Sequence, residues 1–326
     1  MSILNVAICG LGRMGKVHYQ NISNLSSKFK IHYLFDISDS LQPYYNLPIF
    51  HPNLFETKLQ QHDITIDLVF ICSPTTTHYN LIKTSLDNKC NVFVEKPIAE
   101  TNEQLIHCYK IANDNNLVLM SGFNRRYDPK IRELKNKYSK IDNKLIEQIM
   151  VISRDYPYPD KKFIEISNGI YHDSIIHDID TICWILNQYP IKVSSIANIT
   201  SNIGLETGHF DNASTILQFQ NGIIATIITS RISNTHDQRI EFMGKEKSLT
   251  IHNDHHNRII SFPERYHESY LNEILELYQL ITNFNCCSSK IKDSLVSLEQ
   301  SCKILQIINT CQLSQKLNKT MDISYN

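Results

Sequence analysis

An aspartate and a histidine four residues apart are the side chains of this sequence best suited to chemistry. Asp173 and His177 lie in the segment 168–184, whose apolar residues recur with helical spacing. In a helix both side chains leave the same face, about one turn apart. A carboxylate that orients an imidazole is the minimum unit of general acid–base catalysis. The alternative is a polar surface on which the two side chains merely pair.

The rest of this helix favours the chemical interpretation. One face is apolar and is expected to pack on a core: Ile175, Ile179, Ile182 and Leu186. The other face contains no Lys, Arg or Glu: it carries Asp173, His177, Asp180 and Trp184. A solvated face would be rich in long charged side chains, so this second face is expected to border a cleft.

The composition indicates a globular protein of two domains. The chain has 326 residues and a net charge of −1, with no long block of like charges. This balance argues against nucleic acid or a membrane surface as partner. The longest apolar runs, such as 68–72 and 223–228, have the length of strands and not of a membrane span. The start, Met1–Gly10, lacks the basic region of a leader and predicts a first strand.

The nine cysteines include no Cys-x-x-Cys, and several lie in apolar runs. This usage predicts free thiols in a reducing compartment, and therefore a cytoplasmic protein. One polar cluster could be taken for a metal site but fits a hairpin turn better: His252, Asp254, His255 and His256. We predict no metal.

The first 122 residues alternate between strand and helix patterns. The expected strands are Leu4–Cys9, Ile31–Phe35, Leu68–Cys72, Asn91–Val94 and Leu117–Met120. The expected helices are Lys16–Leu25, Thr77–Asn88 and Asn102–Asn115. Such alternation predicts right-handed βαβ units, a parallel sheet and an α/β domain over residues 1–122.

The pattern changes after Gly122, where strand-like runs follow one another closely. They are Leu145–Ser153, Ile191–Ile199, Ala213–Phe219, Ile223–Ser230, Ile240–Met243, Leu249–His252 and Ile259–Phe262. Asn221-Gly222 is a hairpin signal between two of them. Helices are expected at Tyr270–Asn283 and Ile291–Leu313. Residues 123–326 are thus expected to form an α+β domain with a large, mostly antiparallel open sheet.

A dinucleotide site is predicted at the start of the chain. Gly10, Leu11, Gly12, Arg13, Met14 and Gly15 spell G-x-G-x-x-G between the first strand and the first helix. The glycines allow a tight turn, close approach of a pyrophosphate, and close helix–strand packing. Asp36 ends the second strand, where it would bind ribose hydroxyls and repel a 2′-phosphate, which predicts NAD over NADP. The alternative is a glycine-rich turn without a ligand.

Two further loops are expected at the same edge of the sheet. Ser73, Pro74, Thr75 and His78 follow a buried strand and precede a helix, so their polar groups are candidates for cofactor binding. Helix capping by the threonines is the alternative. Glu95 and Lys96 end the next strand, and Lys96 would project towards the nicotinamide end.

With these motifs in place, the chain resembles the Gfo/Idh/MocA oxidoreductase family, and most closely its inositol 2-dehydrogenase branch. The resemblance covers nearly the whole length and rests on five motifs in order: 10–15, 73–78, Glu95-Lys96-Pro97, 122–129 and Asp173-x-x-x-His177-Asp178. It implies a Rossmann domain, a second domain with an open sheet that commonly forms oligomer contacts, and reversible oxidation of a secondary alcohol on a polyol or sugar.

The resemblance also implies roles for individual residues. His177 would take the hydroxyl proton, Asp173 would orient the imidazole, and Lys96 would hydrogen-bond the reacting oxygen. Lys96–Pro97 is a candidate for a cis peptide bond. Arg126 would contact cofactor or substrate, or would be a surface arginine.

Departures from the branch fall on the sugar side. Asn168-Gly169 replaces the usual pair of glycines before the catalytic helix, and Asn-Thr-His-Asp at 234–237 replaces Tyr-Gly-Tyr-Asp. The loop 156–159 is unusually aromatic. The predicted substrate-binding residues are Lys96, Arg126, Tyr156, Asp173, His177, Asn234 and His236.

The leading hypothesis is an NAD-dependent dehydrogenase of a cyclic polyol or sugar, forming a homodimer or homotetramer. One alternative is a dehydrogenase of nucleotide-linked sugars or aldoses. Another, of a different class, is a non-catalytic regulator that binds NAD. Retention of both Lys96 and His177 argues against a regulator.

Overall fold

The chain folds into two compact units. The computed structural model describes residues 2–61, 63–142, 145–245, 248–251, 259–283 and 289–325. The first unit comprises residues up to Phe123 together with 270–301, and the second comprises 124–269 together with 302–326. The sequence predicts one domain over residues 123–326, whereas residues 270–301 belong to the first unit. Nothing in their local pattern indicates which unit they join.

The first unit is built on a six-stranded parallel sheet, in the order β3-β2-β1-β4-β5-β6. Its strands are β1 (Leu4–Cys9), β2 (Phe29–Phe35), β3 (Ile49–Phe50), β4 (Leu68–Ile71), β5 (Asn91–Glu95) and β6 (Leu119–Gly122). Every residue of β4 is buried, as expected for a strand covered on both faces. The predicted strands and their parallel pairing are confirmed.

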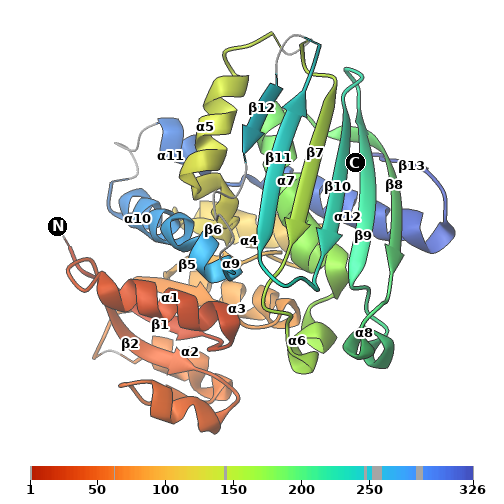
Figure 1. The fold of residues 1–326 in the computed structure, drawn as a ribbon. Helices are drawn as coiled ribbons and strands as arrows, with labels where there is room; N and C mark the ends of the chain where they lie inside the picture. Colours follow the sequence, from red (N-terminus) through yellow and green to blue (C-terminus); the bar gives the residue numbers. More distant parts are fainter. Residues whose placement is uncertain are drawn as a thin grey trace. The chain divides into compact units, whose positions relative to one another are not determined.

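Helices connect these strands (Figure 1). They are α1 (Arg13–Asn24), α2 (Phe55–Leu59), α3 (Thr75–Asp87) and α4 (Asn102–Asp114), and α10 (His267–Asn283) and α11 (Ser289–Ser294) return to this unit from late in the chain. The predicted helices at 16–25, 77–88 and 102–115 are confirmed within a few residues. Strand order changes direction beside β1, so the loops after β1 and β4 meet at the carboxyl edge, where dinucleotides bind in such folds.

The second unit contains a seven-stranded sheet in the order β12-β11-β7-β10-β9-β8-β13. Its strands are β7 (Gln148–Arg154), β8 (Pro190–Asn198), β9 (Asn212–Phe219), β10 (Ile224–Ser230), β11 (Asp237–Met243), β12 (Ser248–Ile251) and β13 (Met321–Asp322). All pairs are antiparallel except β7 with β10. The predicted hairpin at Asn221-Gly222 joins β9 to β10, with Gly222 at a φ of 91°.

Two sequence predictions for the late part of the chain differ from the structure. Residues 259–262 do not form a strand: Ser261 and Glu264 make a capping box and start α9 (Phe262–Arg265). The predicted helix 291–313 is divided into α11 and α12 (Leu298–Leu317). The remaining helices are α5 (Pro129–Tyr138), α6 (Lys161–Ile166), α7 (Ile176–Leu186) and α8 (Asn202–Thr207).

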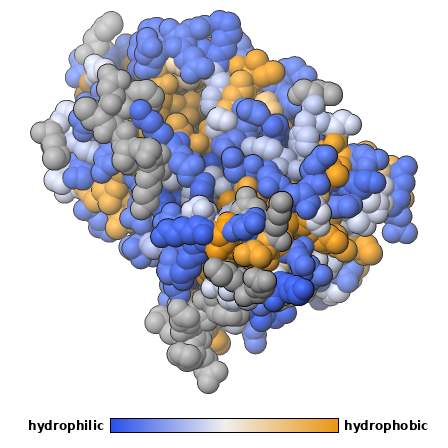
Figure 2. Space-filling model, turned by 90° about the horizontal axis from the view of Figure 1, so that it is seen from above, coloured by the Kyte–Doolittle hydropathy of each residue, from blue (hydrophilic) through white to orange (hydrophobic). Residues whose placement is uncertain are grey.

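The seven-stranded sheet has one covered and one open face. In Figure 1, α7 and α12 lie behind its strands, and nothing described covers the side towards the viewer. Along β9 and β10, buried residues alternate with exposed ones. Isoleucines recur on the open side: Ile196, Ile216, Ile224 and Ile228. Hydrophobic residues also gather in separate areas of the face seen in Figure 2, between hydrophilic ones.

Two further features of the described residues concern membrane spans and cysteines. No described helix combines the length and the apolar character needed to cross a membrane. The cysteines described by the structure are free thiols. The polar cluster at 252–256 lies outside the described residues.

Candidate active site

The glycine motif forms a tight loop between β1 and α1. Gly10 adopts a φ of 87°, and a Cβ there would lie 2.5 Å from the Ser73 nitrogen. A Cβ on Gly15 would lie 2.0 Å from the Gly10 oxygen. A Cβ on Gly12, the residue that precedes α1, would meet no described atom within 4 Å. The loop therefore has the close packing and the open helix start that a pyrophosphate requires.

Asp36 lies against this loop, as the dinucleotide interpretation requires. Its carboxylate accepts hydrogen bonds from the backbone N–H groups of Leu11 (2.7 Å) and Ser38 (2.9 Å). Tyr45 was not recognised in the sequence: its hydroxyl lies 3.5 Å from the Leu11 oxygen. Burial, with the nearby charge of Asp36, raises the pKa of Tyr45 to about 12.

The loop after β4 is braced by a buried histidine. The ring nitrogens of His78 lie 2.8 Å from the Ser73 oxygen and 2.9 Å from the Pro97 oxygen. The imidazole thus ties the 73–78 loop to the loop that follows Lys96, and burial lowers its pKa. Thr77 donates to the Pro74 oxygen (2.8 Å). His78 was predicted to bind cofactor, and both of its nitrogens instead face backbone carbonyls of its own unit.

Glu95 ends β5 within a buried cluster of ionisable groups, and Lys96 follows it directly. Glu95 Oε1 lies 2.8 Å from Nε2 of His18, which is completely buried on α1. Glu273 of α10 is also completely buried, and neither of its oxygens has a hydrogen-bond partner among the described residues. Burial, with the charges of Glu95 and Glu276, raises the pKa of Glu273 well above its ordinary value. The Lys96–Pro97 bond is cis, as predicted.

The Asp173/His177 segment begins with a single π-helical turn, η5 (Tyr171–Ile175), that leads into α7. Such turns occur frequently at functional sites. The predicted apolar face is buried, from Ile175 to Leu186. Asp173 and His177 are partly exposed, whereas the rest of the predicted cleft face, Asp180 and Trp184, is buried. Only the first turn of that face therefore fits the prediction of an accessible site.

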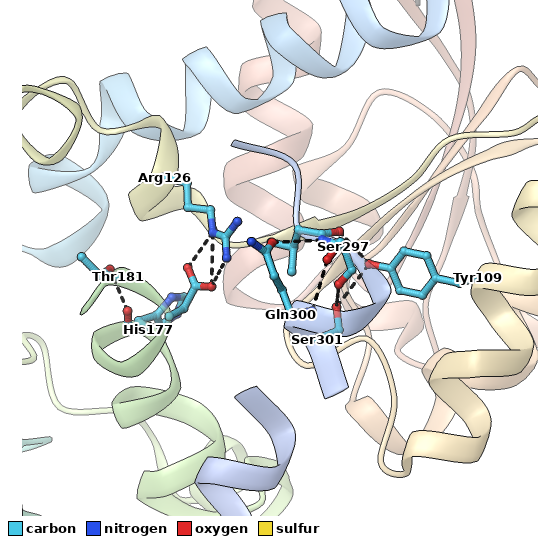
Figure 3. A network of polar contacts seen from close by, with 9 residues as sticks. Tyr109, Arg126, His177, Thr181, Ser297, Gln300 and Ser301 are labelled. Atoms are coloured by element: carbon cyan, nitrogen blue, oxygen red, sulfur yellow. Dashed lines mark hydrogen bonds and ion pairs between the residues drawn. The ribbon is translucent and has the colours of Figure 1, made fainter. Parts of the chain in front are cut away.

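Two arginines account for the buried carboxylates of α7. Arg126 of η3 (Asn124–Tyr127) donates to Asp180 from Nη2 (2.6 Å) and from Nε (3.0 Å), as Figure 3 shows. Arg125 pairs with Asp178 and donates to Ser153 (3.0 Å). Burial raises the pKa of Asp178, and Arg125 opposes this increase. Arg126 is 1 % exposed, so it is not a surface arginine, and its contact with cofactor or substrate stays a prediction.

Arg231 is a partner of Asp173 that the sequence analysis missed. Its side chain is completely buried, and its Nη2 donates to Asp173 Oδ2 (3.0 Å) and to Ser167 Oγ (3.1 Å). The signal that could have found it is its position two residues after the inward-facing Thr229 of β10.

The residues predicted to choose the substrate lie in different surroundings of the second unit. Asn234 is exposed and, with Arg154 and Ser230, lines an open pocket of about 430 Å³. His236 is 3 % exposed, with its ring 5.5 Å from that of Tyr266. Tyr156 is partly exposed. Substrate contact by these three residues stays a prediction.

Comparison with known proteins identifies the family. Residues 4–123 match the family model described as "Oxidoreductase family, NAD-binding Rossmann fold", and residues 146–250 match the GFO/IDH/MocA C-terminal domain. The chain belongs to the Gfo/Idh/MocA oxidoreductase family. The predicted family is therefore confirmed, and so are the fold class and the enzymatic nature of the protein.

The similar proteins include inositol dehydrogenases. The chain is 30% identical to inositol 2-dehydrogenase of Rhizobium meliloti over 292 residues, 82% of this chain and 85% of that protein. It is 28% identical to myo-inositol 2-dehydrogenase of Thermotoga maritima over 297 residues, 83% and 86% of the two chains. The crystal structure of a putative myo-inositol dehydrogenase from Sinorhizobium meliloti matches with a TM-score of 0.82 at 27% identity, covering 98% of this chain and 100% of that one.

Proposed function

We propose that this protein oxidises a secondary hydroxyl of a cyclic polyol of the inositol type, with NAD as hydride acceptor. The observation that carries the proposal is the partial exposure of Asp173 and His177 at the start of an otherwise buried helix. A purely structural ion pair would not need an accessible imidazole. The similarity to inositol dehydrogenases supports the choice of a cyclic polyol over other alcohols.

Each of the three reactive residues has a role in this proposal. His177 accepts the proton of the substrate hydroxyl as the carbon loses its hydride, and Asp173 orients the imidazole and stabilises its protonated form. Lys96 donates a hydrogen bond to the reacting oxygen and stabilises the charge that develops there.

The first unit would hold the cofactor through the 10–15 loop and Asp36. The close contacts made by Gly10 and Gly15, with the open space over Gly12, fit a pyrophosphate at the start of α1. Asp36 lies beside that loop, where its carboxylate would accept bonds from ribose hydroxyls and repel a 2′-phosphate. We therefore infer a preference for NAD over NADP.

Turnover by two variants tests the catalytic assignment. We expect His177→Ala and Lys96→Ala to lower kcat by about 10²–10⁴-fold with myo-inositol, while NAD still binds, because each removes a group that acts on the reacting oxygen. His172→Ala is the matched control: it removes an imidazole from the same segment, one that contacts Asn309. Full turnover by His177→Ala would reject the proposal, and turnover of UDP-sugars alone would reject its substrate.

We further infer that the protein is a homo-oligomer whose subunits meet through the open face of the seven-stranded sheet. The isoleucines that line this face, with Ile196 68 % and Ile216 46 % exposed, would be covered in a dimer. Light scattering tests this. The wild type should be an oligomer and Ile216→Lys should dissociate. A monomeric wild type, or an Ile216→Lys protein with the mass of the wild-type oligomer, would reject the inference.

A further inference from the structure

Arg231 continues the inward-facing row of β10. Ala225, Ile227 and Thr229 are buried on the covered face of the sheet, and Arg231 is completely buried after them. Its backbone N–H donates to the Asp211 oxygen (2.8 Å), which fixes the chain at this point. A guanidinium cannot be deprotonated at ordinary pH, so its burial requires an anionic partner.

The anionic partner of Arg231 is Asp173, and the same guanidinium also contacts Ser167. Nη2 of Arg231 donates to Asp173 (3.0 Å) and to Ser167 (3.1 Å). Between these two residues the chain turns at Asn168 and Gly169, which have positive φ values of 55° and 84°. Nη2 of Arg231 therefore contacts Ser167 before the left-handed residues and Asp173 after them. Asp173 belongs to the π-helical turn.

The charge of Arg231 also acts on a neighbouring histidine. Burial lowers the pKa of His209, and the positive charge of Arg231 lowers it further. Other ionisable groups nearby are Glu165 on α6 and Asp211, which accepts a hydrogen bond from Tyr158 (2.8 Å). His172 lies on the same turn as Asp173.

We propose that Arg231 is the positioning residue of the Asp173/His177 pair, an inference that rests on the proposed function. It fixes the direction of the Asp173 carboxylate through the two contacts of Nη2. It also offsets part of the charge of Asp173, so that His177 releases its proton readily enough to act as a base. Without this offset, the carboxylate would hold the proton on the imidazole more tightly.

The pH profile of kcat/KM separates these effects from simple loss of structure. We compare wild type with Arg231→Gln, which removes the charge, and Arg231→Lys, which keeps it without the fork geometry. Ser167→Ala removes one contact and leaves the charge. We expect the acidic limb of Arg231→Gln to move to higher pH, by on the order of one pH unit. The other two variants should lose roughly tenfold in kcat/KM with the limb in place.

Specific outcomes overturn the inference. The inference is wrong if the acidic limb of Arg231→Gln coincides with that of wild type. It is also wrong if the acidic limb of Ser167→Ala moves as far as that of Arg231→Gln. If Arg231→Gln does not fold, as judged by its melting temperature, Arg231→Lys decides: a displaced limb, or wild-type kcat/KM, rejects the positioning role. Full activity of His177→Ala would instead reject the proposed function itself, whatever the Arg231 variants do.

Discussion

Removing one partner of the buried Arg126–Asp180 pair is expected to destabilise the second unit strongly. Asp180 is completely buried and Arg126 is 1 % exposed, and three N···O distances between them fall between 2.6 and 3.2 Å. Asp180→Leu leaves a buried guanidinium without its carboxylate, which costs about 3–5 kcal/mol. For a unit of about 170 residues, this free energy corresponds to a fall in Tm of roughly 6–20 °C.

A double-mutant cycle shows whether the cost comes from the unpaired charge. Arg126→Met should cost as much as Asp180→Leu, whereas the double variant should lose less than either, because apolar groups replace both charges. Urea unfolding followed by circular dichroism measures the three free energies. Glu206→Ala is the control in the same unit: it breaks the exposed pair with Lys161 and should change stability by about 1 kcal/mol or less.

Two results would refute this reasoning. The first is unfolding of Asp180→Leu at the same urea concentration as wild type, which would mean that water or another group satisfies the guanidinium. The second is a double variant whose loss equals the sum of the two single losses, which would assign the cost to packing alone. The double variant also tests the predicted ligand contact of Arg126, because a real contact would worsen NAD affinity or KM in a protein that is still folded.

Three other variants test the first unit. Glu273→Gln should stabilise the protein increasingly as pH rises from about 4.5. The folded state raises the pKa of Glu273, so above this pH the carboxyl ionises in the unfolded chain but not in the folded protein. Wild type therefore loses stability as pH rises, and the variant does not. Melting temperatures of the variant and of wild type at about pH 5 and about pH 8 measure the difference. An equal gain in Tm at both pH values would contradict the prediction. Gly15→Ala should lower both Tm and NAD affinity, since its Cβ would overlap the Gly10 oxygen, whereas Gly12→Ala should weaken NAD binding alone. Calorimetric titration with NAD checks both, and a Gly15→Ala protein that binds like wild type would be the contrary result.

Local patterns predicted most elements because the relevant forces are local in sequence. The first strand was predicted at its exact bounds. Asp36 was expected at the end of the second strand and follows β2 directly, and the structure adds that its carboxylate accepts the Leu11 N–H. Alternation along β9 and β10 likewise reflects burial on one face. The return of 270–301 to the first unit could not be predicted, because it depends on contacts such as that of Tyr278 with the Ser2 oxygen, 276 residues away.

The burial of Asp180, which the sequence did not predict, has a clear physical cause. Asp180 was expected to face a cleft because no cation lies near it on its own helix. Its partner, Arg126, lies 54 residues earlier, on a different element. An acidic residue on a helix therefore indicates a cleft only if no distant arginine neutralises it, and periodicity carries no information about such partners.

Arg231 shows how this error can be reduced. It continues the period-two row of Ala225, Ile227 and Thr229, so the sequence already places a positive charge on the covered face of the sheet. Such a charge requires a carboxylate from an element packed on that face, and the Asp173 segment is apolar enough to be that element. The buried cation thus links β10 to the candidate acid–base pair through the carboxylate that it requires. The spacing of Asp173 and His177 alone does not contain this link.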